Sequence, residues 1–105
     1  MNSTEIKLVD FLKKECVGEE NAVYGKRLAG YFLGITTREL RRLKENLVLQ
    51  HKIPIGSTGE GYFYAKNDHE VMRIRNEYTS RIRKHSKMVR AYEYMIAHKD
   101  QMQII

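Results

Sequence analysis

The stretch that decides the fold is GITTRELRRLKENL, residues 34–47. A glycine at position 34 can stop a preceding helix, because glycine enters the left-handed conformation without steric cost. Thr36 and Glu39 have the S/T-x-x-E spacing of a capping box, in which each side chain satisfies a free backbone donor of the other residue. The sequence therefore predicts that one helix ends at Gly34 and that the next begins at Thr37 and runs to about residue 50.

The predicted helix 37–50 has two chemically different sides. At about 100° per residue, one side gathers the apolar residues Leu40, Leu43 and Leu47. The opposite side gathers the charged residues Arg38, Arg41, Arg42 and Glu45. The helix is therefore expected to bury its leucines and to present its arginines as one exposed face.

Shorter segments precede this helix. Residues 5–16 carry apolar side chains at helical spacing after a polar Ser3-Thr4 pair, which predicts a helix with Cys16 on its apolar side. Residues 22–24 are too few for more than one isolated strand or an extended linker. Residues 26–33 predict a short helix that turns Leu28, Ala29 and Phe32 inward.

A β-hairpin is predicted after the helix. Pro54 cannot continue a helix, and residues 52–57 read as a strand. Residues 57–61, STGEG, have turn chemistry and form a five-residue tip, and residues 62–65 form the second strand. Tyr62 and Tyr64 share one face of that strand, where they could stack on bases but are better explained as closing the core.

From Asp68 to about His98 the chain has neither glycine nor proline, and Asn67 with Glu70 forms a second capping pattern. Apolar spacings averaging about 3.6 predict one long amphipathic helix. Strict heptad positions would put Arg81 and His85 in the seam, which disfavours a plain coiled coil. We expect a domain over residues 1–66 and a packing or dimerisation helix over 67–105, whose Met- and Tyr-rich end (88–102) meets a partner.

Composition bounds the possible functions. The chain has 105 residues, enough for one modest core, and its 19 Lys and Arg against 13 Asp and Glu give a net charge of +6. This balance favours polyanionic partners or acidic protein surfaces. Cys16 is the only cysteine, and no run approaches about 18 apolar residues, so we expect a cytoplasmic protein without a membrane span.

The order of helix, short strand, helix, tight turn, helix and hairpin, seen in KRLAGYFLGITTRELRRLKENL followed by HKIPIGSTGEGYFYA, resembles a winged helix-turn-helix domain. Residues 22–65 are similar to such domains of bacterial and phage regulators, including the N-terminal domain of biotin repressors. The long C-terminal helix resembles that of short phage and prophage proteins of Gram-positive bacteria. The expected fold class is thus α+β, mostly α: three helices and a β-hairpin wing, followed by a long helix.

The resemblance implies double-stranded DNA as the partner, with helix 37–50 in the major groove and the wing, residues 57–61, on the backbone or minor groove. Arginine pairs bidentately with guanine O6 and N7 or with phosphate. We expect Arg38 and Arg42 to contact base edges, and Arg41, Lys26 and Lys52 to contact phosphates. The remaining predicted DNA-binding residues are Thr37, Ser57, Thr58 and Gly59. A homodimer through the C-terminal helix would suit a palindromic site.

Other functions have weaker support in the sequence. The four histidines and Cys16 lack metal-ligand spacing, GSTGEG lacks the spacing of a phosphate loop, and no acid–base pair stands out. We therefore expect no metal, no cofactor and no enzymatic activity. The rival hypothesis is a phage-type adaptor or inhibitor that binds a host protein, because Glu60 at the wing tip does not suit phosphate contact.

Overall fold

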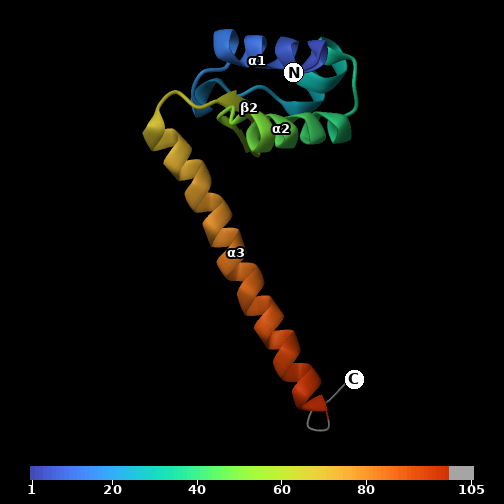
Figure 1. The fold of residues 1–105 in the computed structure, drawn as a ribbon, viewed down its shortest axis with the longest axis vertical. Coiled ribbons are helices and arrows are strands. Elements are labelled where there is room, and N and C mark those ends of the chain that lie inside the picture. The colour runs from blue at the N-terminus through green and yellow to red at the C-terminus, as the bar shows by residue number, and fades with distance from the viewer. Residues whose placement is uncertain (100–105) are drawn as a thin grey trace. The chain divides into compact units, whose positions relative to one another are not determined.

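The computed structural model describes residues 1–99 and is mostly helical, with one two-stranded antiparallel sheet and a long C-terminal helix (Figure 1). Residues 100–105, the end of the predicted segment 67–105, lie outside the described residues. The elements in chain order are α1 (Ser3–Glu15), η1 (Glu19–Asn21), η2 (Arg27–Leu33), α2 (Thr37–His51), β1 (Ile55–Thr58), β2 (Gly61–Tyr64) and α3 (Asp68–Ala97). The chain divides into two compact units, Met1–Val71 and a second that begins at Met72.

The predicted start of α2 is confirmed. The backbone N–H of Glu39 donates to the Thr36 hydroxyl at 3.1 Å, and the Thr36 N–H donates to the Glu39 carboxylate at 3.4 Å. The predicted start of α1 at residue 5 is two residues late. Asn2 caps that helix, because its side chain accepts from the Glu5 N–H at 2.8 Å and its own N–H donates to Glu5 at 3.1 Å.

The short helix before α2 is also confirmed, although η2 is wound as a π-helix. Leu28 and Ala29 are buried on it, and Phe32 packs at the edge of the core. Gly34 ends η2 in the left-handed conformation, with φ of 65°, as the sequence predicts. Only two residues, Ile35 and Thr36, then separate Gly34 from the first residue of α2.

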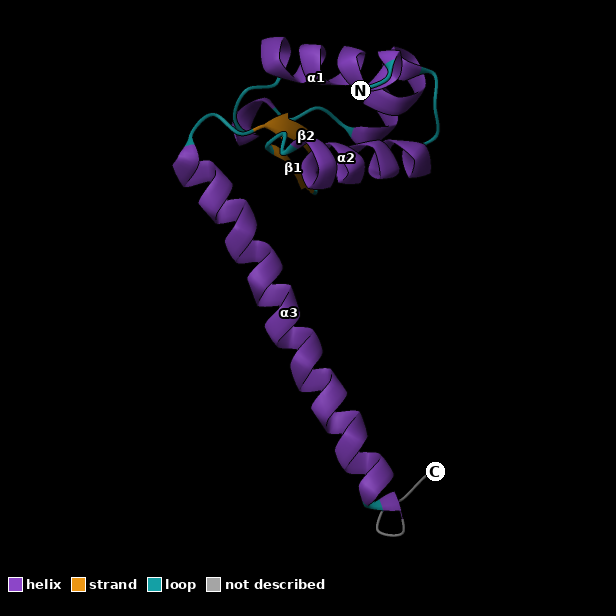
Figure 2. Ribbon diagram, viewed as in Figure 1, coloured by secondary structure: helices purple, strands orange, loops and turns teal. Residues whose placement is uncertain are grey.

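The hairpin of β1 and β2 is present (Figure 2). Its predicted limits are wrong. Lys52 is not a strand residue: it ends α2 in the left-handed conformation, with its N–H bonded to the Leu47 carbonyl. Ser57 and Thr58 belong to β1, and Thr58 pairs directly with Gly61. The tip therefore contains two residues instead of five, because strand pairing extends through the polar residues next to the turn.

Residues 22–24 give one isolated pairing to the hairpin. The Val23 N–H donates to the Tyr62 carbonyl at 2.9 Å, and the Tyr62 N–H donates to the Val23 carbonyl at 2.8 Å. Gly61, with φ of 130°, lies so close to this segment that a Cβ there would collide with the Val23 carbonyl. A side chain is thus excluded at position 61 by the approach of the backbone from residues 22–24.

The core of the first unit joins all its main elements. It contains Leu8, Val9, Leu12, Cys16, Leu28, Ala29, Leu40, Leu47 and Ile55. Tyr62 and Tyr64 are half-buried and pack against this core, which favours the packing interpretation over base stacking. Their position follows from the register, because Ile55 lies opposite Tyr64 and Ser57 opposite Tyr62 on one face of the hairpin.

The long helix α3 is a single helix of 30 residues, close to the predicted 68–98. Asn67 accepts from the Glu70 N–H at 2.9 Å, as a capping residue should. The Glu70 carboxylate is buried and does not complete a capping box; it accepts from the N–H groups of Lys66 at 3.1 Å and Glu19 at 3.3 Å. Over residues 1–99, no helix combines the length and the apolar character that a membrane span needs.

Candidate nucleic-acid interface

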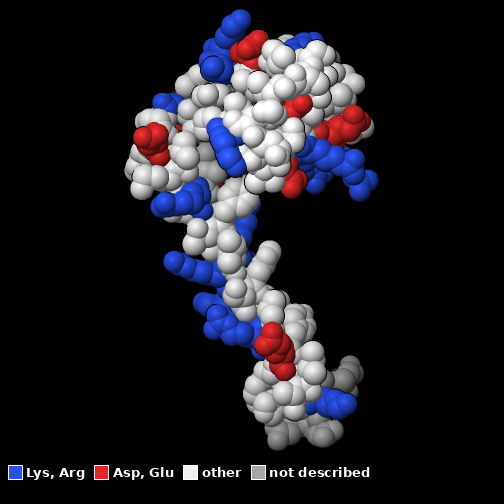
Figure 3. Space-filling model, viewed as in Figure 1, with Lys and Arg blue, Asp and Glu red and all other residues white. Residues whose placement is uncertain are grey.

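The face of α2 opposite its leucines is open to solvent. Leu40 and Leu47 are fully buried beneath the helix, while Thr37, Arg38, Arg41 and Arg42 are exposed. Arg38 and Arg42 are one helical turn apart, a spacing that brings Cβ atoms to within about 6 Å. Lys and Arg side chains lie among acidic ones on the visible surface of the first unit (Figure 3). The structure thus brings the three predicted arginines together on one exposed face.

These arginines lack side-chain partners among residues 1–99. Within the described part of the chain, Arg38, Arg41 and Arg42 form neither a hydrogen bond nor an ion pair through their side chains. The charge of residues 37–47 is positive, since three arginines and Lys44 outnumber Glu39 and Glu45. Three guanidinium groups therefore remain available to an external acceptor.

Lys44 joins this face to the hairpin. Its Nζ donates to the Ser57 hydroxyl at 3.2 Å, and the side chain is half-buried between α2 and β1. Lys44 is not among the residues that the sequence predicts to bind DNA. Lys44 follows Arg41 by three residues, so helical spacing predicts that the two side chains are neighbours on the surface of α2. No sequence pattern predicts the contact of Lys44 with Ser57, thirteen residues later.

The hairpin tip is shaped by its own hydrogen bonds. The Thr58 hydroxyl accepts from the Glu60 N–H at 3.1 Å, and Ser57 accepts from Lys44. Each hydroxyl keeps its own proton for donation. Gly59 is exposed, its φ is not positive, and a Cβ there would meet no atom within 4 Å. The backbone therefore does not require glycine at position 59, whereas it does require glycine at position 61.

The two remaining predicted lysines lie outside α2. Lys26 is exposed and immediately precedes η2. Lys52 is exposed at the C-terminal end of α2, where its Nζ donates to the Leu49 carbonyl at 2.7 Å. Lys52 therefore caps its own helix, and this bond would have to break or be shared if Lys52 contacted a phosphate.

A buried carboxylate anchors α2 to α1. The Asn46 amide donates to Glu5 Oε2 at 2.7 Å, while Asn2 donates to Glu5 Oε1. These hydrogen bonds hold the pKa of Glu5 below its ordinary value, against the opposing effect of burial. This contact holds α2 against α1 at Asn46, one turn after Arg42. Asn46 is therefore a positioning residue, and the sequence did not predict this role.

No family model, curated protein or solved structure matches this chain. What the site can do is thus inferred from its residues. Between residues 1 and 99, no group of three or more His, Cys, Asp or Glu side chains is arranged to hold a metal ion. The chemistry that the face offers is anion binding through guanidinium groups and the free N–H groups at the start of α2.

A second exposed surface lies between α1 and η2. A shallow groove there is lined by Phe11, Val23, Arg27, Leu28, Tyr31 and Phe32. The rings of Phe11 and Phe32 are in contact, with centroids 4.4 Å apart and planes tilted by 35°, and the Lys7 Nζ lies 4.8 Å from the centroid of the Phe32 ring. Tyr31 is 92% exposed, which is unusual for a large aromatic side chain. This surface suits a protein partner better than a phosphate backbone.

Proposed function

We propose that this protein binds double-stranded DNA without catalysing a reaction, as a winged helix-turn-helix protein in transcriptional control or phage DNA metabolism. The observation that carries the proposal is the exposed arginine face of α2, whose three guanidinium groups have no partner among residues 1–99. This face follows η2 after a tight turn at Gly34. A three- or four-residue turn that contains glycine is typical of helix-turn-helix motifs.

The order of elements supports the same proposal. The single pairing of Val23 with Tyr62 adds an extended residue beside the β1–β2 hairpin, which corresponds to the short strand expected between the first two helices of a winged helix. In this arrangement α2 enters the major groove, and the hairpin follows the backbone beside it. Arg38 and Arg42 reach base edges, while Arg41 and the Ser57–Thr58 hydroxyls reach phosphates.

The test is duplex-DNA binding measured at several salt concentrations for single arginine variants. Each lost phosphate contact reduces the slope of log affinity against log salt by about 0.9, and each lost base contact costs about 1–3 kcal/mol at its preferred sequence. Lys14→Ala is the matched control, because it removes one exposed positive charge from α1. If no duplex binds at low salt, or if Lys14→Ala weakens binding as much as Arg38→Ala and Arg42→Ala, the proposal is wrong.

A second candidate function is a protein-interaction module of the adaptor or inhibitor type. The groove beside Tyr31 favours it, because exposed aromatic side chains are enriched at protein interfaces. A host-protein partner captured by the wild-type chain should then be lost with Tyr31→Ala and retained with the Arg38→Ala/Arg42→Ala double variant. The opposite pattern supports the DNA-binding proposal.

A further inference from the structure

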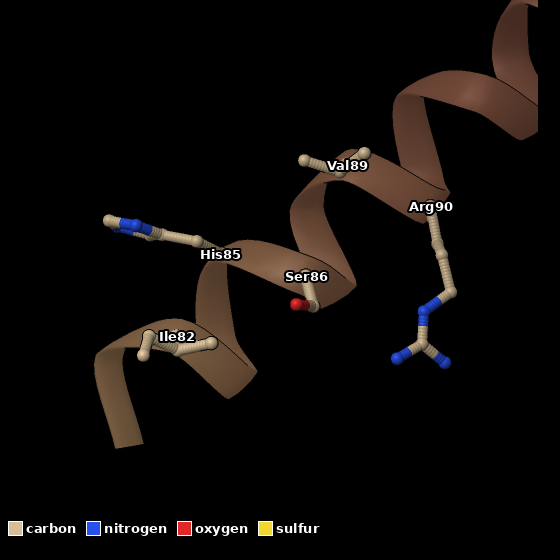
Figure 4. A pocket seen from close by; sticks show the side chains of 5 residues that line it. All are labelled: Ile82, His85, Ser86, Val89 and Arg90. Atoms are coloured by element: carbon tan, nitrogen blue, oxygen red, sulfur yellow. The ribbon is translucent and has the colours of Figure 1, made fainter. Parts of the chain in front are cut away.

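One side of α3 carries a stripe of exposed apolar residues. Ile82, Val89 and Ile96 are 66%, 55% and 74% exposed, and Tyr78 and Tyr92 belong to the same stripe. Figure 4 shows Ile82, His85 and Val89 along this part of the helix, with Ser86 and Arg90 completing a shallow groove. A run of exposed apolar side chains over several turns is typical of a surface that another helix covers.

The sequence spacing of the stripe residues gives the number of residues per turn at which the stripe repeats. From Ile74, the steps to Tyr78, Ile82, His85, Val89, Tyr92 and Ile96 are 4, 4, 3, 4, 3 and 4 residues. Three residues in eleven is a period of about 3.67, whereas a left-handed coiled coil needs 3.5. The stripe therefore suits a nearly straight helix pair and explains why heptad positions include Arg81.

The four central residues of the stripe are arranged symmetrically. The steps 4, 3 and 4 from Tyr78 through Ile82 and His85 to Val89 read identically from either end, about the point between Arg83 and Lys84. When two copies of α3 run in opposite directions about this point, Ile82 lies opposite the partner's His85, and Tyr78 lies opposite the partner's Val89. A parallel pair would instead set His85 against itself and align all of the basic segment 81–90, which has no acidic residue, with its copy, whereas the antiparallel pair overlaps this segment with its copy only over residues 81–86.

The edges of the stripe are complementary in the antiparallel arrangement. Arg75 and Glu93 are 18 residues apart, which is five turns, so they lie on the same edge of the helix. Ile74 and Tyr92 have the same separation and share the other edge. In an antiparallel pair, like edges meet, so Arg75 lies beside the partner's Glu93 and Ile74 lies beside the partner's Tyr92. Each contact occurs twice by symmetry.

We propose that the exposed stripe of α3 pairs antiparallel with the α3 stripe of a second copy of this chain. The pair is centred between Arg83 and Lys84, with Ile82, His85, Tyr78 and Val89 in its seam and an Arg75–Glu93 ion pair at each end. Association is measured without DNA, so its outcome is independent of the proposed DNA binding.

The first test is the oligomeric state of the full-length chain by sedimentation equilibrium. The wild-type chain is expected to dimerise, and Ile82→Asp to shift the dissociation constant upward by about a hundredfold or more, because it buries a charge in the seam. Ser80→Asp adds the same charge on the opposite side of α3 and is expected to change the constant by less than about threefold. A wild-type chain that stays monomeric at about 1 mM, the weak end of specific association, overturns the proposal.

The second test is orientation. Single variants Tyr78→Cys and Val89→Cys are oxidised separately and as a mixture; Cys16 stays in place because it is buried. The antiparallel pair predicts cross-linked dimers that contain one copy of each variant, since two residues at position 78 would be about 16 Å apart along the axis. Efficient self-cross-linking of either variant means a parallel pair and contradicts the proposal.

The third test is the ion pair. Arg75→Glu and Glu93→Arg are each expected to weaken the dimer about threefold to tenfold, because each places like charges side by side at both ends. The double variant restores the opposite-charge contact and is expected to recover most of the affinity. Additive weakening in the double variant rules out this register.

Discussion

The side-chain amide of Asn46 donates a 2.7 Å hydrogen bond to the buried carboxylate of Glu5, across 41 residues of sequence. This contact ties the middle of α2 to the first turn of α1. Asn46→Ala leaves a buried carboxylate oxygen without this donor, at an expected cost of about 1–3 kcal/mol in the free energy of unfolding. Gln50→Ala, one turn later on the exposed side of α2, is the control and should change stability by less than about 0.5 kcal/mol in the same urea titration.

The same carboxylate makes stability depend on pH. Because the folded protein lowers the pKa of Glu5, the folded state favours the charged form, and the resulting stabilisation is fully present above the ordinary glutamate pKa of about 4.3. It is lost as pH falls from that value through the lower pKa of the folded state. Unfolding titrations between about pH 5 and pH 3 should thus show a smaller loss for Glu5→Gln than for the wild-type chain. An unchanged loss in Glu5→Gln, with the exposed Glu60→Gln as control, contradicts this assignment.

The two glycines of the hairpin should respond very differently to substitution. Gly61→Ala places a Cβ against the Val23 carbonyl at a φ of 130°, so we expect a loss of about 3 kcal/mol, near the upper end of ordinary single substitutions. The Cβ that Gly59→Ala adds would point into open space, so this variant should change the free energy of unfolding by less than about 1 kcal/mol. Thermal melts of both variants separate these outcomes; equal losses would mean that the approach of residues 22–24 is not what requires glycine.

Features of the fold that depend on neighbouring residues could be predicted from the sequence. The Thr36–Glu39 capping box and the end of η2 at Gly34 each involve residues within about one helical turn. Their residue types and spacing were therefore sufficient to predict where η2 ends and where α2 begins. The limits of the hairpin were missed, because strand pairing rather than polarity decides where Ser57 and Thr58 belong. Lys52 was misplaced because a lysine in the left-handed conformation is uncommon and leaves no sequence signal.

Long-range contacts of the candidate site could not be predicted. The leucine and arginine sides of α2 follow from helical periodicity alone, and the structure confirms their burial and exposure. The bonds of Asn46 to Glu5 and of Lys44 to Ser57 join side chains whose proximity exists only after the core has assembled. Burial of Glu70 against the backbone of Glu19 is of the same kind.

The thiol of Cys16 should react only slowly with alkylating agents in the folded protein. The side chain lies in the core, and burial, followed by the nearby Glu15 charge, raises the pKa of its thiol. Alkylation at neutral pH should therefore be more than about a hundredfold slower than in the unfolded chain, because a domain of ordinary stability opens in far fewer than one molecule in a hundred. The measurement is the rate of iodoacetamide labelling with and without denaturant. Rapid labelling of the native chain would show that α1 does not stay packed over position 16.

Substitutions on the two sides of α2 should have different effects on the stability of the fold. Leu40 is fully buried in the core, so Leu40→Ala is expected to cost about 2–5 kcal/mol. Its neighbour Arg41 is exposed and has no partner among residues 1–99, so Arg41→Ala should stay within about 0.5 kcal/mol of the wild-type chain. Denaturant titrations measure both changes. A large loss of stability in Arg41→Ala would mean that Arg41 makes a stabilising contact within the folded protein, and this guanidinium group would then not be available for the proposed contact with DNA.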